Sequence, residues 1–545
     1  MAARRSGRSE NADASAGAHT GTSAPTDGME RRWWTLIAVC GATFMLLVDV
    51  TIVQVALPTM QRSLHASFSD LQWVISAYAL SLSSVILTQG ALADRFGRKR
   101  IFVLGLVVFT LASLACGLAG SPGELIGARA VQGIGGAAMF ATSLALIGQD
   151  FHGSERSAAI AAWGATVGGA VAVGPLVGGA LTSGLGWQWI FYVNVPIGVL
   201  TLVLSRRMLN VADPASERLD WPGLVTFSGG LFLLVLGLTR GNDDGWRSSE
   251  IVSILVSAVV LLVAFVIVEL RQPRPMFDLS LFRKPAFTGV SLATFAIGAG
   301  MFALLPYLTF SLQNDLGLSP LQGGLRLLPL TVLSFIVPLA SRPLTERIPA
   351  GMALTVGLVI CAAGIWLFLG LTVSSTWTAL LPGLLVGGLG IGLANPAIAK
   401  IALGVVAPQR SGMASGISNT FRLGGVATGV AALGAIFQGR IQTTLQGATG
   451  HTSTALAQAV AAGGARAAAQ VTAGRPLMLE AVHRAFVNGV NDLVGVGAVT
   501  VLVGAAFAVL VRRKDFYSRR RAGYRPPVPA PEADDLAALP ERVST

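Results

Sequence analysis

Two long apolar runs, separated by one dense cluster of charge, constrain this chain more than any other feature of its sequence. Residues 71–90 and 101–120 are almost wholly apolar. Each run is about as long as the roughly 20 residues that a helix needs to cross a bilayer. Residues 90–100, between them, hold one acidic and four basic side chains. We therefore expect two membrane helices joined by a tight cytoplasmic turn, because basic loops are retained on the inner side.

The composition extends this expectation to the whole chain. Of its 545 residues, 53% are hydrophobic and only 12% are charged, whereas a soluble domain carries about 25% charged residues. The net charge of +12 would suggest nucleic-acid binding in a soluble protein. In a membrane protein, basic loops beside anionic lipid explain the same charge. The composition thus predicts an integral membrane protein with no nucleic-acid partner.

Counting the apolar runs predicts the topology. An even number of crossings places both termini on one side, and that side should be the cytoplasm of a cell-membrane protein. With this orientation 29 of the 39 Lys and Arg residues lie inside, 7 lie outside and 3 fall within helices, as the positive-inside rule requires. There are fourteen runs, at about residues 33–57, 71–90, 101–119, 124–147, 157–182, 187–205, 222–239, 250–269, 286–311, 320–340, 351–372, 378–403, 411–438 and 487–511.

A faint internal repeat divides the chain. Residues 342–349 align with residues 90–97, and they follow the tenth apolar run. A simple duplication of six helices would instead place them after the eighth run. We therefore expect two helices to be inserted between two six-helix halves. The expected divisions are a disordered cytoplasmic tail (1–32), an N-terminal half (33–205), two inserted helices with linkers (206–285), a C-terminal half (286–511) with an outer loop (439–486) that becomes amphipathic from about Leu477, and a cytoplasmic tail (512–545).

Two charged residues lie inside predicted membrane helices. Asp49 is about 24 Å along the first helix from Trp33, counted at about 1.5 Å a residue, and an ionisable group at that depth is a candidate functional residue. It could bind and release a proton, or it could be a structural acid bonded to a neighbouring helix. Arg129 has Gln132 and several glycines nearby. It could pair with Asp49, or it could extend to the outer headgroups.

The fifth apolar run is rich in small residues. Gly174, Pro175, Gly178 and Gly179 form the pattern G-P-x-x-G-G. Glycines at this spacing let helices approach closely, and a proline inside a helix removes a hydrogen bond and bends it. Close packing alone would account for such a pattern in many membrane helices.

Signatures of other chemistry are absent from the sequence. It has no G-x-x-x-x-G-K-[ST] phosphate loop and no H-E-x-x-H pair, so neither an ATP-driven pump nor a metalloenzyme is expected. Cys40, Cys116 and Cys361 are isolated in apolar runs and have no metal-binding spacing. We expect a protein that is not an enzyme, binds no metal and uses no cofactor beyond a proton gradient.

Three of these stretches resemble one family. Residues 90–99 follow G-x-L-A-D-R-x-G-R-K, which resembles the signature loop of the major facilitator superfamily. Residues 49–58 follow D-x-T-x-V-x-x-A-L-P and resemble the first helix of its fourteen-helix drug:proton antiporters, and G-P-x-x-G-G resembles the family's exporter motif. The family has Arg where this chain has Gln188. The resemblance implies an all-α membrane fold of two six-helix halves plus two inserted helices, fourteen in all.

The resemblance also implies roles for residues. Asp49 would carry the proton with Arg129 as its partner. A cytoplasmic latch, which holds the two halves together in one conformation, would comprise Gly90, Asp94, Arg95, Gly97 and Arg98. Substrate contacts near the midplane would come from residues such as Gln54, Tyr78, Gln132, Phe302, Tyr307, Asn395 and Asn419.

The expected function is proton-coupled export of hydrophobic or amphipathic drugs by a monomer, through alternating access of the two halves. The alternative is a proton-coupled importer of a small solute on the same fold, and the G-P-x-x-G-G stretch argues against it.

Arg326 and Arg422 lie within predicted helices of the C-terminal half. The interiors of the ninth to thirteenth predicted helices contain no acidic residues. Ion pairing or extension to headgroups would explain both arginines, but they also favour neutral or anionic substrates.

Overall fold

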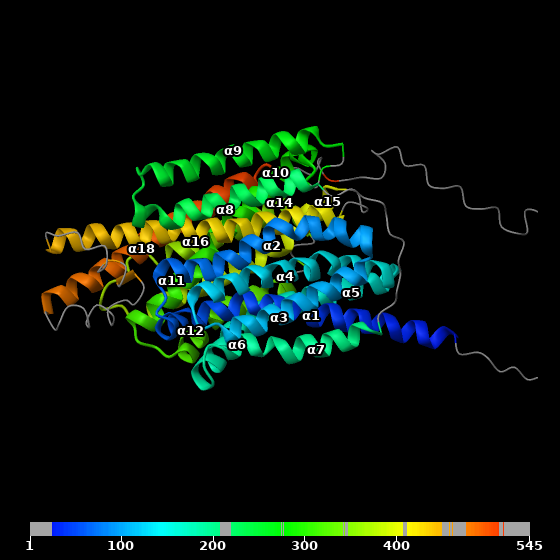
Figure 1. Cartoon of the computed structure of the whole chain (residues 1–545), viewed down its shortest axis with the longest axis horizontal. Coiled ribbons are helices and arrows are strands. Elements are labelled where there is room, and N and C mark those ends of the chain that lie inside the picture. The colour runs from blue at the N-terminus through cyan, green and yellow to red at the C-terminus, as the bar shows by residue number, and fades with distance from the viewer. Residues whose placement is uncertain are drawn as a thin grey trace, which may run out of the picture.

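The computed structural model describes residues 24–207, 220–273, 275, 277–341, 343, 347–406, 411–449, 457, 460–461, 476–511 and 516. All regular structure in these residues is helical (Figure 1). The first bundle contains α1 (Ala24–Leu64), α2 (Phe68–Phe96), α3 (Arg98–Leu118), α4 (Pro122–Asp150), α5 (Gly153–Gly184), α6 (Trp189–Tyr192) and α7 (Asn194–Ser205).

A hairpin of α8 (Trp221–Asp244) and α9 (Ser249–Arg271) follows, and then a second bundle. The second bundle opens with an interrupted helix that contains two π-helical segments. Its elements are η1 (Leu279–Arg283), α10 (Pro285–Ile297), η2 (Gly298–Phe302), α11 (Ala303–Phe310), η3 (Ser311–Asp315), α12 (Pro320–Ala340), α14 (Ala350–Trp366), η4 (Trp377–Leu380), α15 (Leu381–Gly404), α16 (Ser411–Thr449) and α18 (Pro476–Ala508).

Local sequence explains where several of these helices begin and end. Ser67 and Asp70 form a capping box at the start of α2, and Ser319 and Gln322 form another at the start of α12. Such reciprocal bonds satisfy backbone N–H groups that a helix start leaves free. α2 ends at Gly97, whose φ of 99° is a conformation that glycine adopts without a steric penalty. One residue therefore suffices to turn the chain from α2 into α3.

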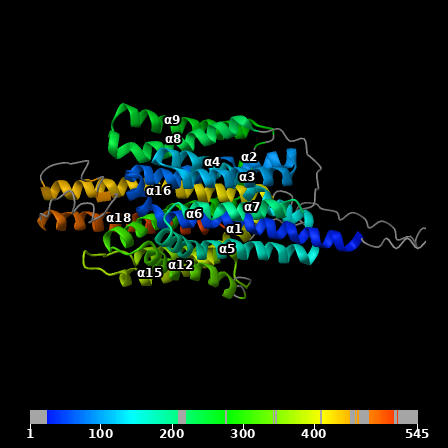
Figure 2. The same ribbon diagram turned by 60° about the horizontal axis from the view of Figure 1, so that its bottom comes forward.

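The two bundles meet through two pairs of helices. α5 of the first bundle packs along α12 of the second, and α2 packs along α16. α8 lies against both α2 and α16, where Leu231 and Val235 pack with Ala79 and Ala427. Figure 2 shows the α8–α9 hairpin as a separate layer at the edge of the molecule. The hairpin therefore covers one of the two seams between the bundles, the one formed by α2 and α16.

Most of these helices suit a bilayer. Twelve helices in the described part of the chain are long and apolar enough to cross a membrane, and both hairpin helices are among them. Trp189–Ser205 and Ala350–Trp366 are shorter apolar helices. The start of α1 and the end of α18 lie toward the same end of the bundle (Figure 1). That end carries the α2–α3 turn and is called the Gly97 end below; the other, with the α1–α2 turn, is the His65 end.

The structure corrects several sequence-based boundaries. Residues 24–32 belong to α1 and not to a disordered tail, and α2 continues through the charged cluster to Phe96. The expected outer loop 439–486 is helical at its start, because α16 runs to Thr449, whereas the start of α18 at Pro476 agrees with the amphipathic segment expected from about Leu477. Polar and small residues lowered the apparent hydropathy of these helix extensions. Residues 1–23, 208–219, most of 450–475, nearly all of 512–545, and Arg342 and 344–346 of the repeat lie outside the described residues.

Candidate functional site

A buried ion pair lies inside the first bundle. Asp49 of α1 and Arg129 of α4 are in direct contact through Oδ2 and Nη1, and their side chains are 0% and 2% exposed. The sequence predicted this pairing, and the structure brings the two residues together. Because an isolated charge in such a place would be very costly, each residue depends on the other.

Two amides complete the coordination of the Asp49 carboxylate. Gln132 Nε2 donates to Oδ1 at 3.0 Å, and Asn194 Nδ2 donates to the same oxygen at 3.2 Å. Both amides also donate to Ser113 Oγ, at 3.2 and 3.0 Å. The carboxylate therefore holds four helices together, since Asp49 lies on α1, Ser113 on α3, Gln132 on α4 and Asn194 on α7.

The guanidinium of Arg129 is equally enclosed. Its Nη1 donates to Gln132 Oε1 at 2.7 Å, and its Nε donates to the Val74 carbonyl at 3.3 Å. Its Cζ lies 4.1 Å from the centre of the Tyr78 ring, in a cation–π contact. This arrangement excludes an extension of Arg129 to the headgroups. Protonation of Asp49 would remove the countercharge of a guanidinium that has no route to water in this conformation.

Sequence reasoning missed two members of this network. Ser113 is an ordinary serine in an apolar run, and nothing near it distinguishes it. Asn194 carried a usable signal, because an amide within a membrane helix is an expected interhelical partner. Cys116 lies beside the network, with Sγ 3.7 Å from Gln132 Oε1. Among the described residues, no group of three His, Cys, Asp or Glu side chains is placed to hold a metal ion.

The seven candidate substrate residues differ in their contacts. Tyr78 and Gln132 belong to the ion-pair network, whereas Tyr307 donates to the Val430 carbonyl at 2.6 Å between the bundles. Asn419 accepts a bond from Arg422 at 2.6 Å. The three remaining candidates have no polar contact that defines a site: Gln54 is buried, and Phe302 and Asn395 are half-buried.

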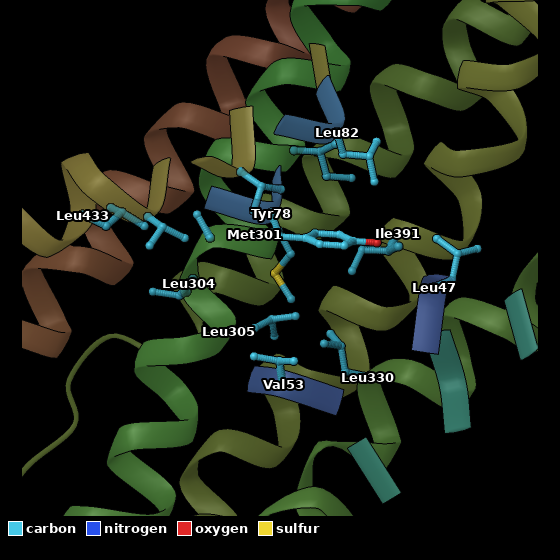
Figure 3. Close-up of a cluster of buried hydrophobic side chains, with 14 of the residues drawn as sticks. Leu47, Val53, Tyr78, Leu82, Met301, Leu304, Leu305, Leu330, Ile391 and Leu433 are labelled. Carbon is cyan, nitrogen blue, oxygen red and sulfur yellow. The ribbon is translucent and has the colours of Figure 1, made fainter. Parts of the chain in front are cut away.

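The interior between the bundles is mainly apolar. Figure 3 shows the cluster, in which Leu47, Val53 and Leu82 of the first bundle face Met301 and Leu330 of the second. Ile391 and Leu433 complete it from α15 and α16, and the Tyr78 hydroxyl also points into it. Such a surface suits a hydrophobic or amphipathic molecule.

The G-P-x-x-G-G motif lies where α5 touches both bundles. A Cβ on Gly174 would overlap Thr51 of α1, and one on Gly178 would stand 2.8 Å from Ile52 Cγ1. On the other face of α5, a Cβ on Gly179 would stand 2.7 Å from the Leu321 Cα of α12. The Pro175 carbonyl lies directly against Gly324 of α12. The small residues of the motif thus let the backbone of α5 approach α1 within the first bundle and α12 of the second bundle.

Contacts between the bundles concentrate at the His65 end. Gln313 Nε2 donates to the Val55 carbonyl at 2.7 Å, and the Leu321 N–H donates to Ser183 Oγ at 3.0 Å. Gln72 Nε2 donates to Tyr307 Oη at 3.1 Å. These bonds join α1, α5 and α2 of the first bundle to η3, α12 and α11 of the second. The His65 end is therefore closed.

Toward the Gly97 end, the contact along α5 stops. A Cβ on Gly168 would still meet the Phe335 ring at 2.7 Å, whereas one on Gly164, a turn further, would have nothing within 4 Å. Residues 160–162 of α5 are exposed. The bundles consequently separate along α5 and α12 beyond Gly168.

The candidate latch lies wholly within the first bundle in this structure. Arg98 Nε donates to Asp94 Oδ1 at 3.0 Å, and Arg98 Nη1 donates to the Ala145 carbonyl of α4 at 3.4 Å. Arg95 is exposed, with its guanidinium over the Phe96 ring. A Cβ on Gly90 would have nothing within 4 Å, so no neighbouring helix approaches closely at Gly90 in this conformation. Gly97 has a positive φ.

Several curated proteins with similar sequences are resistance or export proteins. The chain is 32% identical to the tetracenomycin C resistance and export protein of Streptomyces glaucescens, over 95% of this chain and 97% of that one. It is 37% identical to the puromycin resistance protein of Streptomyces alboniger, over 75% and 82%. It is also 37% identical to the cephamycin export protein of Amycolatopsis lactamdurans, over 73% and 83%.

Solved structures share the fold. A bacterial homologue of the human lysosomal transporter Spinster, in an inward-facing unoccupied conformation, matches with a TM-score of 0.60 and 19% identity, over 90% of this chain and 99% of that one. A peptide transporter in complex with sulfate matches with a TM-score of 0.60 and 15% identity, over 89% and 96%. Residues 39–430 match the Major Facilitator Superfamily. The all-helical fold, the apolar spans and these similarities identify the chain as a transporter that belongs to the Major Facilitator Superfamily.

Proposed function

We propose that this transporter exports hydrophobic or amphipathic drugs or antibiotics across the cell membrane in exchange for protons. The Asp49–Arg129 pair is the observation that carries the proposal, because a buried, fully coordinated acid inside a membrane bundle is a natural proton carrier. The relatives named for the export of tetracenomycin C and cephamycin support the direction of transport. The apolar interior supports the class of substrate.

The mechanism follows from the coordination of Asp49. When the carboxylate is charged, it binds Arg129, Gln132 and Asn194 and holds α1, α4 and α7 in one arrangement. A proton on Asp49 removes the attraction to Arg129, so this arrangement loses its main electrostatic support. The bundles of residues 33–205 and 286–511 would then rock about the apolar interior, which opens alternately to either side.

The orientation belongs to the same proposal. Both termini are cytoplasmic, so the Gly97 end faces the cytoplasm and the His65 end faces outward. The basic residues of the α2–α3 turn support this orientation. It requires Trp189–Ser205 and Ala350–Trp366 to cross the membrane with the twelve longer spans, which makes fourteen. The described conformation is then closed outside, and the latch of Asp94 and Arg98 is disengaged from the second bundle.

The alternative is a proton-coupled importer of a small solute on the same fold. The close contacts of Gly174 and Gly179, in the motif typical of exporters, favour export. Everted membrane vesicles discriminate between the two functions. An exporter accumulates a lipophilic drug in everted vesicles when an inwardly acidic gradient is imposed, whereas an importer depletes it.

The assay uses the full chain and an Asp49→Asn variant, with a protonophore as control. Gradient-driven accumulation by the wild-type protein that is lost in the variant and with the protonophore is the expected result. Accumulation only in right-side-out vesicles would overturn the proposed direction. Accumulation that persists in the Asp49→Asn variant would overturn the proton site.

A further inference from the structure

Arg422 is a cation near the middle of the bundle that no described acid neutralises. It lies on α16, where the Thr420 hydroxyl donates to the Ser83 carbonyl of α2 at 3.2 Å. Because α2 and α16 run in opposite directions, this bond places Arg422 near the level of Leu82, a member of the interior cluster. A guanidinium at this depth is costly unless a partner compensates its charge.

The Arg422 side chain lies on the same face of α16 as Leu433, which belongs to the interior cluster. Leu433, which points into the interior cluster (Figure 3), lies eleven residues after Arg422. Eleven residues are about three helical turns, so both residues lie on the same face. Arg422 is only half-buried, and none of its nitrogens is among the buried atoms that lack a partner. The guanidinium donors other than Nη2 are therefore not buried without a partner.

The charges of the neighbouring elements leave this cation unpaired. Its one described hydrogen bond is from Nη2 to the neutral carboxamide of Asn419, at 2.6 Å. The described acids between α10 and α18 are Asp315, Glu480 and Asp492, and each faces a basic residue toward the His65 end: His483, Arg484 and Arg440. In the first bundle, Asp49 is already committed to Arg129. Among the described residues, Arg422 therefore has no acidic partner.

An irregular backbone segment adjoins Arg422. The backbone carbonyl of Arg422 lies directly against Gly298, the first residue of the π-helical segment η2. Gly429 of α16 also packs closely on this segment, since a Cβ on Gly429 would stand 2.6 Å from the Ala299 Cα. π-helical segments frequently mark functional sites. Met301, in the same segment, contributes to the apolar cluster. A charged donor and an apolar surface therefore lie side by side on the second bundle.

We propose that Arg422, positioned by Asn419, binds an anionic group of the transported compound, such as a carboxylate or an ionised phenol, while the apolar cluster holds the rest. This inference rests on the proposed export function and names its preferred substrate class as acidic amphiphiles. An anionic group would form charge-assisted bonds with the guanidinium of Arg422. A lipophilic cation would instead meet repulsion there.

Binding to purified, full-length protein tests the proposal separately from transport. The probes are aromatic carboxylic acids, each paired with its primary amide, starting with 9-anthracenecarboxylic acid and its amide, in nanodiscs of neutral phosphatidylcholine. Arg422→Gln should weaken binding of the acid at least tenfold and leave the amide within twofold. Arg422→Lys should keep most of the preference for the acid. The matched control is Arg326→Gln, which removes the same charge from α12, where Arg326 stacks on Trp377.

Several results would overturn the proposal. The wild-type protein could fail to prefer any acid over its amide, or Arg422→Gln could leave the preference intact while the thermal unfolding midpoint confirms a folded protein. Phosphatidylglycerol in the discs could displace the acid tenfold, which would make the site one for a lipid headgroup. If binding behaves as expected but vesicles show no export, the proposed function fails while the anion site stands.

Discussion

Asn194 of α7 donates a hydrogen bond to Oδ1 of Asp49 in α1, although the two residues are 145 positions apart in the chain. Its second donation, to Ser113 Oγ, ties α3 to the same carboxylate. The ion pair of Asp49 and Arg129 is therefore held in place by the neutral amides of Gln132 and Asn194. This second layer of contacts can be tested without altering either charged residue.

Asn194→Leu should destabilise the protein by about 1–3 kcal/mol, because it removes one of the two amide donors to the buried Asp49 carboxylate and one of the two to the buried Ser113 hydroxyl. The loss should appear as a lower midpoint of thermal unfolding in detergent. Gradient-driven transport should fall several-fold. Thr166→Val is the matched control, since the Thr166 hydroxyl donates to the Ala162 carbonyl of its own helix and has no bond to the ion-pair network. Equal unfolding midpoints for Asn194→Leu and the control would contradict the role of Asn194.

Asp49→Asn should reduce pH-gradient-driven efflux at least tenfold. An amide has nearly the shape of the carboxyl but cannot release a proton, and it leaves the buried Arg129 without a countercharge. The measurement is efflux from proteoliposomes at a fixed gradient. Asp70→Asn, which changes an exposed acid in the capping box of α2, should leave coupling intact. Retained gradient-driven efflux in Asp49→Asn would show that another group carries the proton.

Gly179→Ala should destabilise the conformation that is closed at the His65 end. Its methyl group would stand 2.7 Å from the Leu321 Cα and the Pro320 carbonyl, so α5 and α12 could not keep their present contact. Spin labels on the His65 ends of α5 and α12 should report a larger population of long distances. Gly164→Ala, on the same helix but with open space around it, is the control. Identical distance distributions for both variants would contradict this packing role.

Asp94→Asn should impair transport while leaving equilibrium drug binding within a few-fold. Asp94 holds Arg98 beside α4 at the Gly97 end, far from the apolar interior. Its loss should change how fast the bundles exchange conformation and not what they bind. Glu155→Gln removes another ion-paired acid from the same end, the partner of Arg32, and should be neutral. Lost binding with unchanged exchange kinetics would rule out a conformational latch.

Local patterns in the sequence are sufficient to predict much of this protein. Apolar length predicts the helices, since a bilayer requires runs of about 20 apolar residues whatever their neighbours are. Asp49 and Arg129 could be predicted because charge is rare and costly within such runs. Gly97 could be predicted as a turn residue because it lies in the charged cluster between two apolar runs and because glycine adopts a positive φ without a steric penalty. These features depend on a residue and its near neighbours in the chain.

Only the tertiary structure decided which residues act together. Ser113 and Asn194 join Asp49 because three helices distant in sequence pack around α1, and hydropathy does not encode that packing. The seven candidate substrate residues were chosen by residue type, and only the fold shows that Tyr78 and Gln132 belong to the ion-pair network. Likewise the extension of α16 to Thr449 follows from contacts with α18 and α8 and not from hydropathy. Side-chain partnership is a property of distances between helices, and these distances are set by packing of the whole bundle.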